Sequence, residues 1–376
     1  MVILVILVIA GALFSLQRML YSRYWDRGLS AELTFSAHRV NEGDHVDMDE
    51  LVSSRKLLPL PWLGLKFHVS RDLVFPDDPF TSVSDWSYRE ELFSIGAFQQ
   101  IRRRHHVFCR RRGFFTFKSI DLISSDLLAS NKLATQVASA ASLYVFPRPV
   151  PERELDIPIE RVNGELLTRR HLVEDPFEFI GIREYHLDDP LKSINWKATA
   201  RTGGLMVNVR GHTSTQAVEL LVNVEYPSLW SEERLIEDAI RVAATLADRL
   251  TAEGLAVGMR ANGRDIVTRE NPRVPAGSSD DHMIAVNESL ARLDLHLKPR
   301  PFADLLDECL LEADDGPLFL LVSAAFNDDI LDRFRALRDH GMRCLWILPH
   351  PVGQPVPLDA DLAESGLVIT REVVNA

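Results

Sequence analysis

Apolar and polar residues follow three different patterns along the 376-residue chain. Residues 2–16 read VILVILVIAGALFSL without a charge, a run shorter than the roughly 20 apolar residues that cross a bilayer. Between about residues 30 and 147, apolar and polar positions alternate, as in residues 31–36 and 65–70, and this period of two predicts β-strands. From about residue 215 onward, strand patterns alternate with helical ones.

The second half of the chain predicts a mostly parallel sheet with helices on both faces. The strands are expected at 218–224, 255–260, 317–323, 342–348 and 366–370, and the helices at about 232–250, 281–295, 302–313 and 328–338. Ser231 is expected to cap the first helix, and Gly254 stands where a C-terminal cap glycine belongs. Asn262-Gly263 predicts a hairpin turn to a strand at 265–269.

These patterns predict a fold class of α/β plus all-β. Prolines at turn spacing in the first half favour a small β-sandwich. A connector that begins with Pro147-Arg-Pro-Val-Pro151 follows it. The predicted organisation is a transmembrane anchor at 1–21, a β-sandwich at 30–147, a connector at 148–214 and a doubly wound α/β domain at 215–376.

The most distinctive segment of the connector runs from residue 179 to 207. It reads FIGIREYHLDDPLKSINWKATARTGGLMV, with an Arg-x-Tyr, an acidic turn, a basic residue, Ile-Asn-Trp-Lys and Ala-Arg. This segment resembles the signature of the domain of unknown function 58 family, in which a Pro-Gly usually stands where His186-Leu187 stands here. The matching positions are Arg183, Tyr185, Asp188, Asp189, Lys192, Ile194, Asn195, Trp196, Lys197, Ala200 and Arg201.

The resemblance implies a membrane anchor, a β-sandwich and an α/β domain similar to the von Willebrand factor A domain. Members of the family are often encoded beside MoxR-type AAA+ ATPases, so the resemblance implies such an ATPase as partner. It implies no enzymatic activity. The function expected is that of a membrane-anchored scaffold or adaptor protein.

Two interpretations of the signature remain open. Its charges and Trp196 can form a structural clamp, in which a buried indole and paired charges dock the connector on the sheet. Alternatively, the same residues form a surface that contacts a partner protein or a nucleotide.

A metal site is a second candidate, at the carboxyl ends of the sheet strands, where open α/β sheets bind ligands. A von Willebrand A domain holds Mg²⁺ there with Asp-x-Ser-x-Ser, and this chain has Asn223, Glu225 and Pro227 at those positions. These residues offer few of the hard oxygen ligands that Mg²⁺ prefers, so no metal and no cofactor are expected. The alternative function is a metal-dependent binding module or hydrolase that uses Asn223, Glu225 and Ser228.

Charge and cysteine content narrow the partners. The chain has 42 Lys and Arg against 54 Asp and Glu, a net charge of −12, which argues against nucleic acid as a partner. Its 3 cysteines form no paired motif, which suits a reducing compartment. Arg18, Arg23 and Arg27 follow the apolar run, so the positive-inside rule predicts a single-pass protein of the cell membrane with its soluble domains in the cytoplasm. Membrane lipid is therefore the expected partner of the anchor.

One cluster of arginines stands apart from this acidic background. Arg102, Arg103, Arg104, Arg110, Arg111 and Arg112 bracket residues 105–109. The cluster is consistent with solvated side chains on an edge strand, which discourage pairing with another sheet. It is also consistent with contact to anionic lipid.

Overall fold

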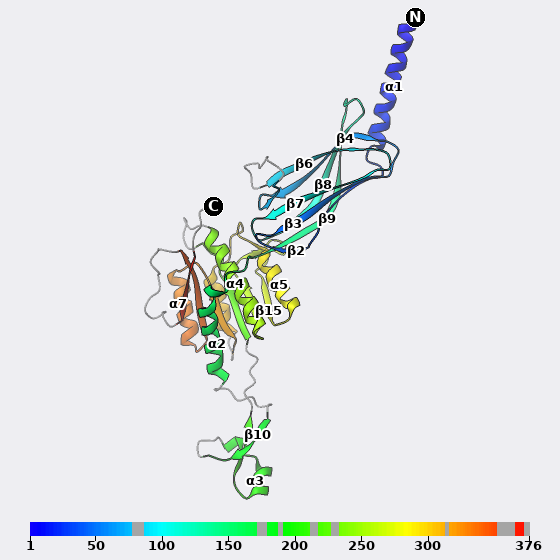
Figure 1. Ribbon diagram of the computed structural model, residues 1–376. Coiled ribbons are helices and arrows are strands. Elements are labelled where there is room, and N and C mark those ends of the chain that lie inside the picture. Colours follow the sequence, from blue (N-terminus) through cyan, green and yellow to red (C-terminus); the bar gives the residue numbers. More distant parts are fainter. Residues whose placement is uncertain are drawn as a thin grey trace. The chain divides into compact units, whose positions relative to one another are not determined.

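The computed structural model describes residues 1–76, 86–170, 179–186, 191–210, 217–226, 233–312, 316–351 and 365–371. The chain forms two compact units, Met1–Arg148 and Pro149–Ala376. Each unit has its own hydrophobic core. Figure 1 labels the helices and strands of both units.

The first unit consists of an N-terminal helix and two β-sheets. The helix is α1 (Val2–Tyr24), and the strands are β1 (Leu29–Phe35), β2 (Arg39–Asn41), β3 (His45–Ser54), β4 (Leu60–Ser70), β5 (Leu73–Val74), β6 (Trp86–Ile95), β7 (Gln100–Cys109), β8 (Gly113–Ser125) and β9 (Lys132–Phe146). One sheet has the order β1-β3-β7-β5 and the other the order β2-β9-β8-β4-β6. Neighbouring strands are antiparallel apart from the parallel pair β2 and β9.

Both sheets contribute to one apolar core. Met48 and Val107 come from the first sheet, and Leu65 and Leu143 come from the second; all four are fully buried. Because side chains alternate between the faces of a strand, this places one face of each sheet toward the shared core. The period of two that predicted strands in this half is therefore confirmed as a burial pattern, as in β1, where Ala31 and Leu33 are buried.

Helix α1 is longer than the uncharged run alone predicts. Its segment Ile3–Tyr24 is 22 residues long with a mean hydropathy of 2.2, long and apolar enough to cross a membrane. The end of the helix is part of the β unit, because Tyr21 and Trp25 are only 2% and 5% exposed in its core. The Tyr21 hydroxyl donates a hydrogen bond to the Pro59 carbonyl oxygen at 2.8 Å.

The second unit is built on a six-stranded sheet of order β15-β13-β12-β17-β18-β19. Its strands are β12 (Ala217–Val222), β13 (Ala256–Ala261), β15 (Arg273–Gly277), β17 (Leu318–Val322), β18 (Cys344–Pro351) and β19 (Gly366–Arg371). All neighbours are parallel except β13 and β15. Two short strands, β14 (Arg264–Asp265) and β16 (Leu293–Asp294), pair outside this sheet.

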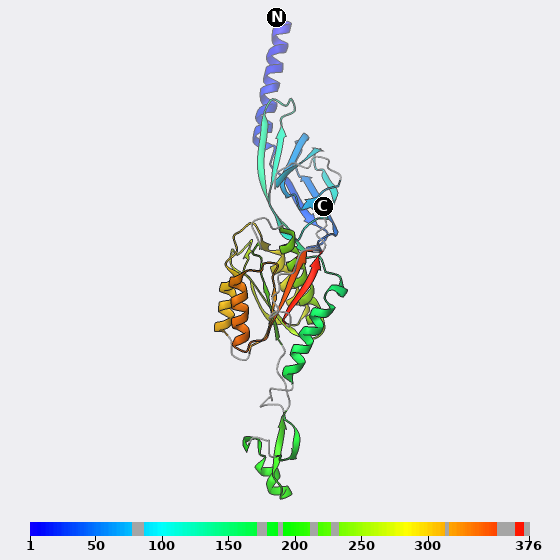
Figure 2. The ribbon, with the colours of Figure 1, turned by 90° about the vertical axis from the view of Figure 1, so that its left-hand side faces the viewer.

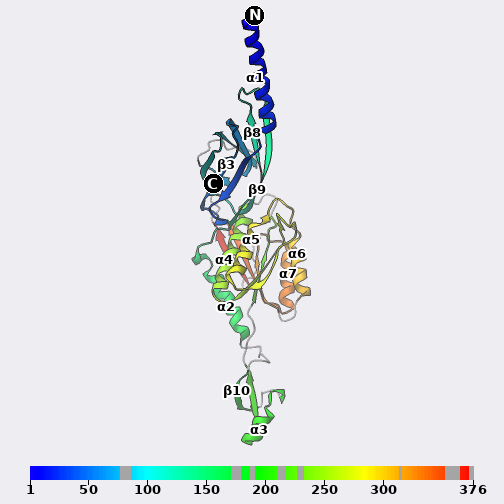
Figure 3. The ribbon, with the colours of Figure 1, turned by 90° about the vertical axis from the view of Figure 1, so that its right-hand side faces the viewer.

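Helices cover both faces of this sheet (Figures 2 and 3). The helices are α2 (Asp156–Arg170), α4 (Glu233–Ala252), α5 (Asp280–Ala291), α6 (Phe302–Leu311) and α7 (Asp328–Asp339). Side chains of α2, α4 and α5 pack with Val218, Leu220 and Val222 of β12 on one face. Side chains of α6 and α7 pack with Leu221 on the other. The alternation of strands and helices expected from the sequence is confirmed, and Gly254 follows α4 with a φ of +85°.

One helix of this unit was not predicted, and one expectation was wrong. The connector contains α2, whose Ile159, Val162 and Leu166 join the core together with Leu155, which precedes the helix, at a helical spacing that the charged residues obscure. Asn262-Gly263 does not close a hairpin, because β13 pairs with β15, and neither residue has a positive φ. Gly263 is instead needed for close packing, since a Cβ there would lie 2.7 Å from Val224 Cγ2.

Candidate functional site

The signature segment folds into a small hairpin module with its own hydrogen bonds. Strands β10 (Phe179–Glu184) and β11 (Met206–Arg210) are antiparallel, and between them lie a 3-10 turn, η2 (Leu191–Ser193), and a short helix, α3 (Trp196–Thr202). Ile194 and Val207 form an isolated bridge and are 8% and 2% exposed. These two side chains are the buried centre of the described part of the module.

Asn195 explains why an amide occupies its place in the Ile-Asn-Trp-Lys motif. Its Oδ1 accepts a hydrogen bond from the Ala198 backbone N–H at 2.9 Å and caps α3, while its Nδ2 donates to Asn208 Oδ1 on β11 at 2.7 Å. Gly203 ends the helix with a φ of +76°, in the left-handed region that suits glycine. The motif therefore fixes the orientation of α3 on the hairpin.

The outward side of the module is apolar and basic. Trp196 is 69% exposed and Leu191 is 72% exposed. The signature cations Lys192, Lys197 and Arg201 are exposed too, and none forms an ion pair with another residue that the structure describes. The expected buried indole is therefore wrong: Trp196 begins a helix on the surface and belongs to no hydrophobic core formed by the described residues.

The remaining signature residues divide between the strand and the acidic turn. Arg183 is exposed on β10 and its Nη1 donates to the Glu184 carbonyl oxygen at 3.0 Å. Tyr185 is half-buried, and its backbone N–H donates to the Leu205 carbonyl oxygen at 2.9 Å. Asp188 and Asp189 lie outside the described residues. The face that is described suits an acidic or aromatic partner, because guanidinium and ammonium groups bind carboxylates and an exposed indole buries a large apolar area.

The carboxyl ends of the sheet strands form a second, closed polar cluster. Asn223, which follows β12, is 1% exposed and donates from Nδ2 to Ser323 Oγ at 2.9 Å. Its Oδ1 accepts from Asn262 Nδ2 and from the Glu225 backbone N–H, both at 2.9 Å. Three strand ends are thus joined by one amide whose donor and acceptor are both used inside the protein.

Glu225 also serves the fold. Its Oε1 accepts a hydrogen bond from the Phe302 backbone N–H at 3.1 Å, at the start of α6, where a negative charge is favourable. Burial raises the pKa of this carboxyl group above its ordinary value. Pro227 and Ser228 lie outside the described residues. Among the residues that the structure describes, no three His, Cys, Asp or Glu side chains come together as a metal site.

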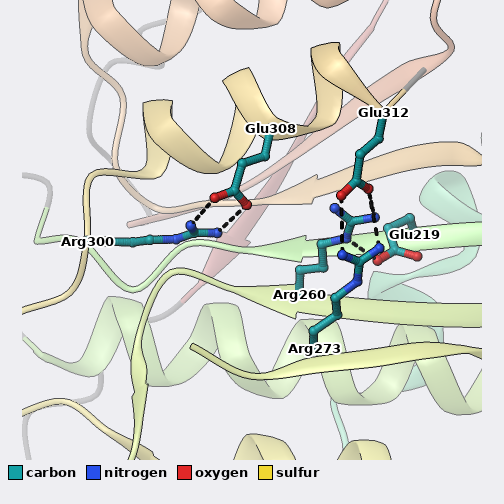
Figure 4. A network of polar contacts seen from close by, with 6 residues as sticks. All are labelled: Glu219, Arg260, Arg273, Arg300, Glu308 and Glu312. Atoms are coloured by element: carbon teal, nitrogen blue, oxygen red, sulfur yellow. Dashed lines mark hydrogen bonds and ion pairs between the residues drawn. The ribbon is translucent and has the colours of Figure 1, made fainter. Parts of the chain in front are cut away.

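A partly buried ion-pair network on the sheet was missed in the sequence (Figure 4). Arg260 of β13 is 8% exposed; its Nε donates to Glu219 Oε1 at 2.8 Å and its Nη2 lies 2.6 Å from Glu312 Oε2. Arg273 of β15 binds both oxygens of Glu312, at 3.2 and 3.3 Å. The sequence signal for this network was a single charged residue in each of two otherwise apolar strands, Glu219 in β12 and Arg260 in β13. Every carboxylate in the network faces an arginine, which is typical of a structural ion-pair cluster.

A separate ion pair joins Arg300, which precedes α6, to Glu308 within that helix. The guanidinium of Arg300 binds both carboxylate oxygens of Glu308, at 2.5 and 2.9 Å (Figure 4). This contact lowers the pKa of Glu308. The pair holds the segment that leads into α6. The first backbone N–H of that helix, on Phe302, donates to Glu225.

Three arginines of the cluster in the first unit form ion pairs with carboxylates. On β7, Arg102 lies 3.0 Å from Asp49 Oδ2, Arg103 pairs with Glu91, and Arg104 Nε donates to Asp49 Oδ1 at 2.9 Å. These contacts lower the pKa of Asp49, first through the hydrogen bond from Arg104. Carboxylates on neighbouring strands thus take up the charge that an anionic lipid would otherwise meet.

The architecture defines a class of protein with an apolar N-terminal helix, a two-sheet β unit and an α/β unit that carries the signature module. Residues 181–342 match the model of the family described as Protein of unknown function DUF58. The match covers the signature and most of the α/β unit, and it supports assignment of the chain to that family. Among curated proteins, none matches the sequence significantly.

Solved structures resemble parts of the chain only weakly. The CARDB domain of the PF1109 protein from Pyrococcus furiosus, in complex with di-metal ions, is 11% identical with a TM-score of 0.19, covering 30% of this chain and 91% of that one. BslA, a bacterial hydrophobin, is 13% identical with a TM-score of 0.20, covering 33% and 97%. β-Glucosidase from Listeria innocua is 10% identical with a TM-score of 0.16, covering 31% and 16%. Similarities this weak carry no argument about fold or function.

Proposed function

We propose that this protein is a membrane-anchored adaptor whose signature module binds a MoxR-type AAA+ ATPase. The observation that carries the proposal is the exposure of Trp196, 69%, on a module held in shape by its own hydrogen bonds. Tryptophan, tyrosine and arginine are enriched among the residues that dominate binding energy at protein interfaces, and the exposed Arg201 lies on the same module. The ATPase as the partner rests on the family resemblance.

At the level of the fold, the proposal treats the first unit as a β-sandwich and the second as a von Willebrand A-like domain with a degenerate metal loop. The shared core of the two sheets supports the first part. The use of Asn223 and Glu225 for hydrogen bonds within the fold supports the second. Because Asn223 and Glu225 are engaged in these hydrogen bonds, the described residues give no support to the metal-dependent hydrolase.

Anchoring is the other half of the proposal. The length and hydropathy of α1 support insertion in a bilayer. The arginines that follow the apolar run support a cytoplasmic location for both units. A C-terminal alkaline phosphatase fusion should then be inactive in cells, while a fluorescent protein fusion at the same place should be bright. An active phosphatase fusion would reverse the orientation.

The partner is tested by purifying the full chain from membranes in mild detergent and measuring its binding to a MoxR-type AAA+ ATPase. Trp196→Ala should weaken the measured affinity by about 30-fold or more, which corresponds to the roughly 2 kcal/mol of an interface hot spot. Its free energy of unfolding should stay within about 0.5 kcal/mol of the wild type, because the side chain is exposed.

Leu311→Ala is the matched control, since Leu311 is an apolar side chain with 88% exposure at the end of α6. This variant should bind the ATPase like the wild type. Equal binding by Trp196→Ala and wild type would remove the signature module from the interface. The adaptor proposal would be wrong if the wild-type protein did not bind the ATPase and instead turned over a small molecule. The protein would then be an enzyme.

A further inference from the structure

Several loops of the β unit meet at the end from which α1 emerges (Figure 1). The Arg55 backbone N–H donates to the Gly28 carbonyl oxygen at 2.7 Å, which joins the β3–β4 loop to the segment after α1. The Phe98 backbone N–H donates to the Lys56 carbonyl oxygen at 3.2 Å and adds the β6–β7 loop. The β8–β9 loop lies against the helix itself, because Gln17 Nε2 donates to Asp126 Oδ2 at 3.0 Å.

The tips of these loops are apolar and exposed. We refer to Leu57, Phe98, Leu127 and Leu128 as the apolar rim; they are 78%, 66%, 52% and 63% exposed. Each comes from a loop that these hydrogen bonds join to α1 or to another loop of the same end. Large apolar side chains collected at one end of a unit mark a contact surface.

The β8–β9 loop is held rigidly in this exposed position. Asp126 is 3% exposed, and its Oδ1 accepts from the Ser130 and Asn131 backbone N–H groups at 2.6 and 3.2 Å. Hydrogen bonds from Ser130 and Gln17 hold the pKa of this carboxyl group at about 2. An ordered loop that exposes two leucines to water must be stabilised by its surroundings or covered by something apolar.

Cationic side chains lie in the two segments next to Leu57, together with the exposed Asp26. Arg27 and Arg55 are exposed in these segments, and the Arg27 guanidinium lies 4.8 Å from the centre of the exposed Tyr24 ring. The ammonium group of Lys56 is shielded from solvent and has no hydrogen-bond partner among the described residues. Cations with aromatic and apolar side chains are the composition that phospholipid interfaces bind, through phosphate groups and upper acyl chains respectively.

We propose that the apolar rim inserts into the surface of the same bilayer that α1 enters, so that the β unit stands directly on the membrane and is not tethered above it. The inference rests on the proposed anchoring of α1. The apolar surface of α1 argues for lipid as the occupant, because it continues past Gln17 through Met19 and Leu20, which are 60% and 40% exposed. The β8–β9 loop is bonded to the helix at this level, so a bilayer that covers the helix reaches the loop.

The consequence is a fixed orientation of the β unit on the membrane. A helix anchor alone allows rotation and tilt of the attached unit, whereas three loop contacts around the helix restrict both. Each buried leucine or phenylalanine side chain also adds to the affinity for the bilayer in proportion to the apolar area it removes from water.

The test uses the full chain in nanodiscs of phosphatidylcholine and phosphatidylglycerol, with an environment-sensitive NBD fluorophore attached to single introduced cysteines. Leu128→Cys and Phe98→Cys probe the rim, and His38→Cys, exposed in the loop between β1 and β2 at the other end of the strands, is the matched control. The native thiols should not react, because Cys109, Cys309 and Cys344 are buried and burial raises their pKa to about 12, 11 and 12.

The rim labels should show blue-shifted emission, and spin-labelled lipid should quench most of their fluorescence intensity. The His38→Cys label should emit as in water and keep its intensity. Labels at the rim that remain water-like in a protein that resists carbonate extraction would overturn the inference and leave the anchor intact. A protein released by carbonate would overturn the anchor and the inference together. Labels shielded from water but unquenched by spin-labelled lipid would show that protein covers the rim, which also overturns the inference.

Discussion

Two asparagines show how a single amide can organise a surface at the scale of residues. Asn195 caps α3 and holds it to β11, and Asn223 joins the ends of three sheet strands. In both cases the side chain donates and accepts at once, which neither a carboxylate nor an apolar residue can do. At Asn223, these hydrogen bonds within the protein occupy the side-chain amide that would otherwise be available to a ligand.

Asn223→Ala should lower the free energy of unfolding of the second unit by about 1–3 kcal/mol, the usual cost of leaving buried polar groups without partners. Urea unfolding followed by tryptophan fluorescence measures the change, since Trp346 is buried in this unit. Asn163→Ala is the control, because Asn163 donates a surface hydrogen bond to Glu253, and it should change stability by less than about 0.5 kcal/mol. Equal effects of both substitutions would contradict this role of Asn223.

Glu225 gives the second unit a predictable response to pH. Burial raises the pKa of its carboxyl group in the folded protein above the ordinary value of 4.5, so the folded state binds the proton more tightly than the unfolded state. This contribution to stability is fully present below pH 4.5 and is lost as the pH rises through the folded pKa.

Glu225→Gln keeps an oxygen for the Phe302 backbone N–H but does not titrate. The stability of this variant relative to the wild type should therefore increase as the pH rises from 4.5 toward neutrality. Urea unfolding at a series of pH values measures the difference. Parallel stability profiles for the two proteins would show that Glu225 does not titrate differently in the folded state.

At the scale of elements, Asn262-Gly263 shows how a turn motif can serve packing. The dipeptide follows β13, where it meets β12 and the short strand β16. A Cβ on Gly263 would lie 2.7 Å from Val224 Cγ2 and 2.9 Å from Leu293 Cδ2, closer than real Cβ atoms approach. The glycine is therefore required because of the approach of two elements and not because of a positive φ.

Gly263→Ala should destabilise the second unit by about 1–3 kcal/mol, the usual cost of overpacking. Gly204→Ala is the matched control, since nothing lies within 4 Å of the Cβ position there. A thermal melt of both variants decides the point. If Gly263→Ala melts at the same temperature as the wild type, the side chains of Val224 and Leu293 can move to make room for a Cβ. The glycine would then not be required for packing.

At the scale of the whole molecule, the anchor and the β unit share residues. Tyr21 and Trp25 belong to the β core, although the helix that carries Tyr21 also carries the apolar segment. A soluble fragment that begins at Gln17 should retain the melting temperature of the β unit. A fragment that begins at Leu29 loses two buried aromatic side chains, and each such loss costs about 3–5 kcal/mol.

Differential scanning calorimetry of the two fragments tests this. The longer fragment should show a β-unit transition that is lowered or absent in the shorter one, while the transition of the second unit stays the same. Identical transitions would place Tyr21 and Trp25 outside the cooperative core. The result also decides which fragment is suitable for binding measurements without the membrane segment.

The sequence by itself determined the local elements, because periodicity and capping act within a few residues. The strand at 218–224, the long helix that follows it and Gly254 after that helix were all predicted and are found as β12, α4 and a positive φ. The family resemblance of residues 179–207 was also readable, and the match over residues 181–342 supports it.

Only the tertiary structure decided what those residues do. The hydrogen bonds of Asn223 and Asn262 join segments that are 38 to 100 residues apart. The network around Arg260 also joins distant segments. Trp196 is exposed because no distant segment packs over it among the described residues. The loops around α1 depend on strand register, which brings Gly28, Arg55 and Phe98 to one end of the unit. Periodicity reports which face of an element is apolar, but not what that face will touch, because burial is set by long-range packing.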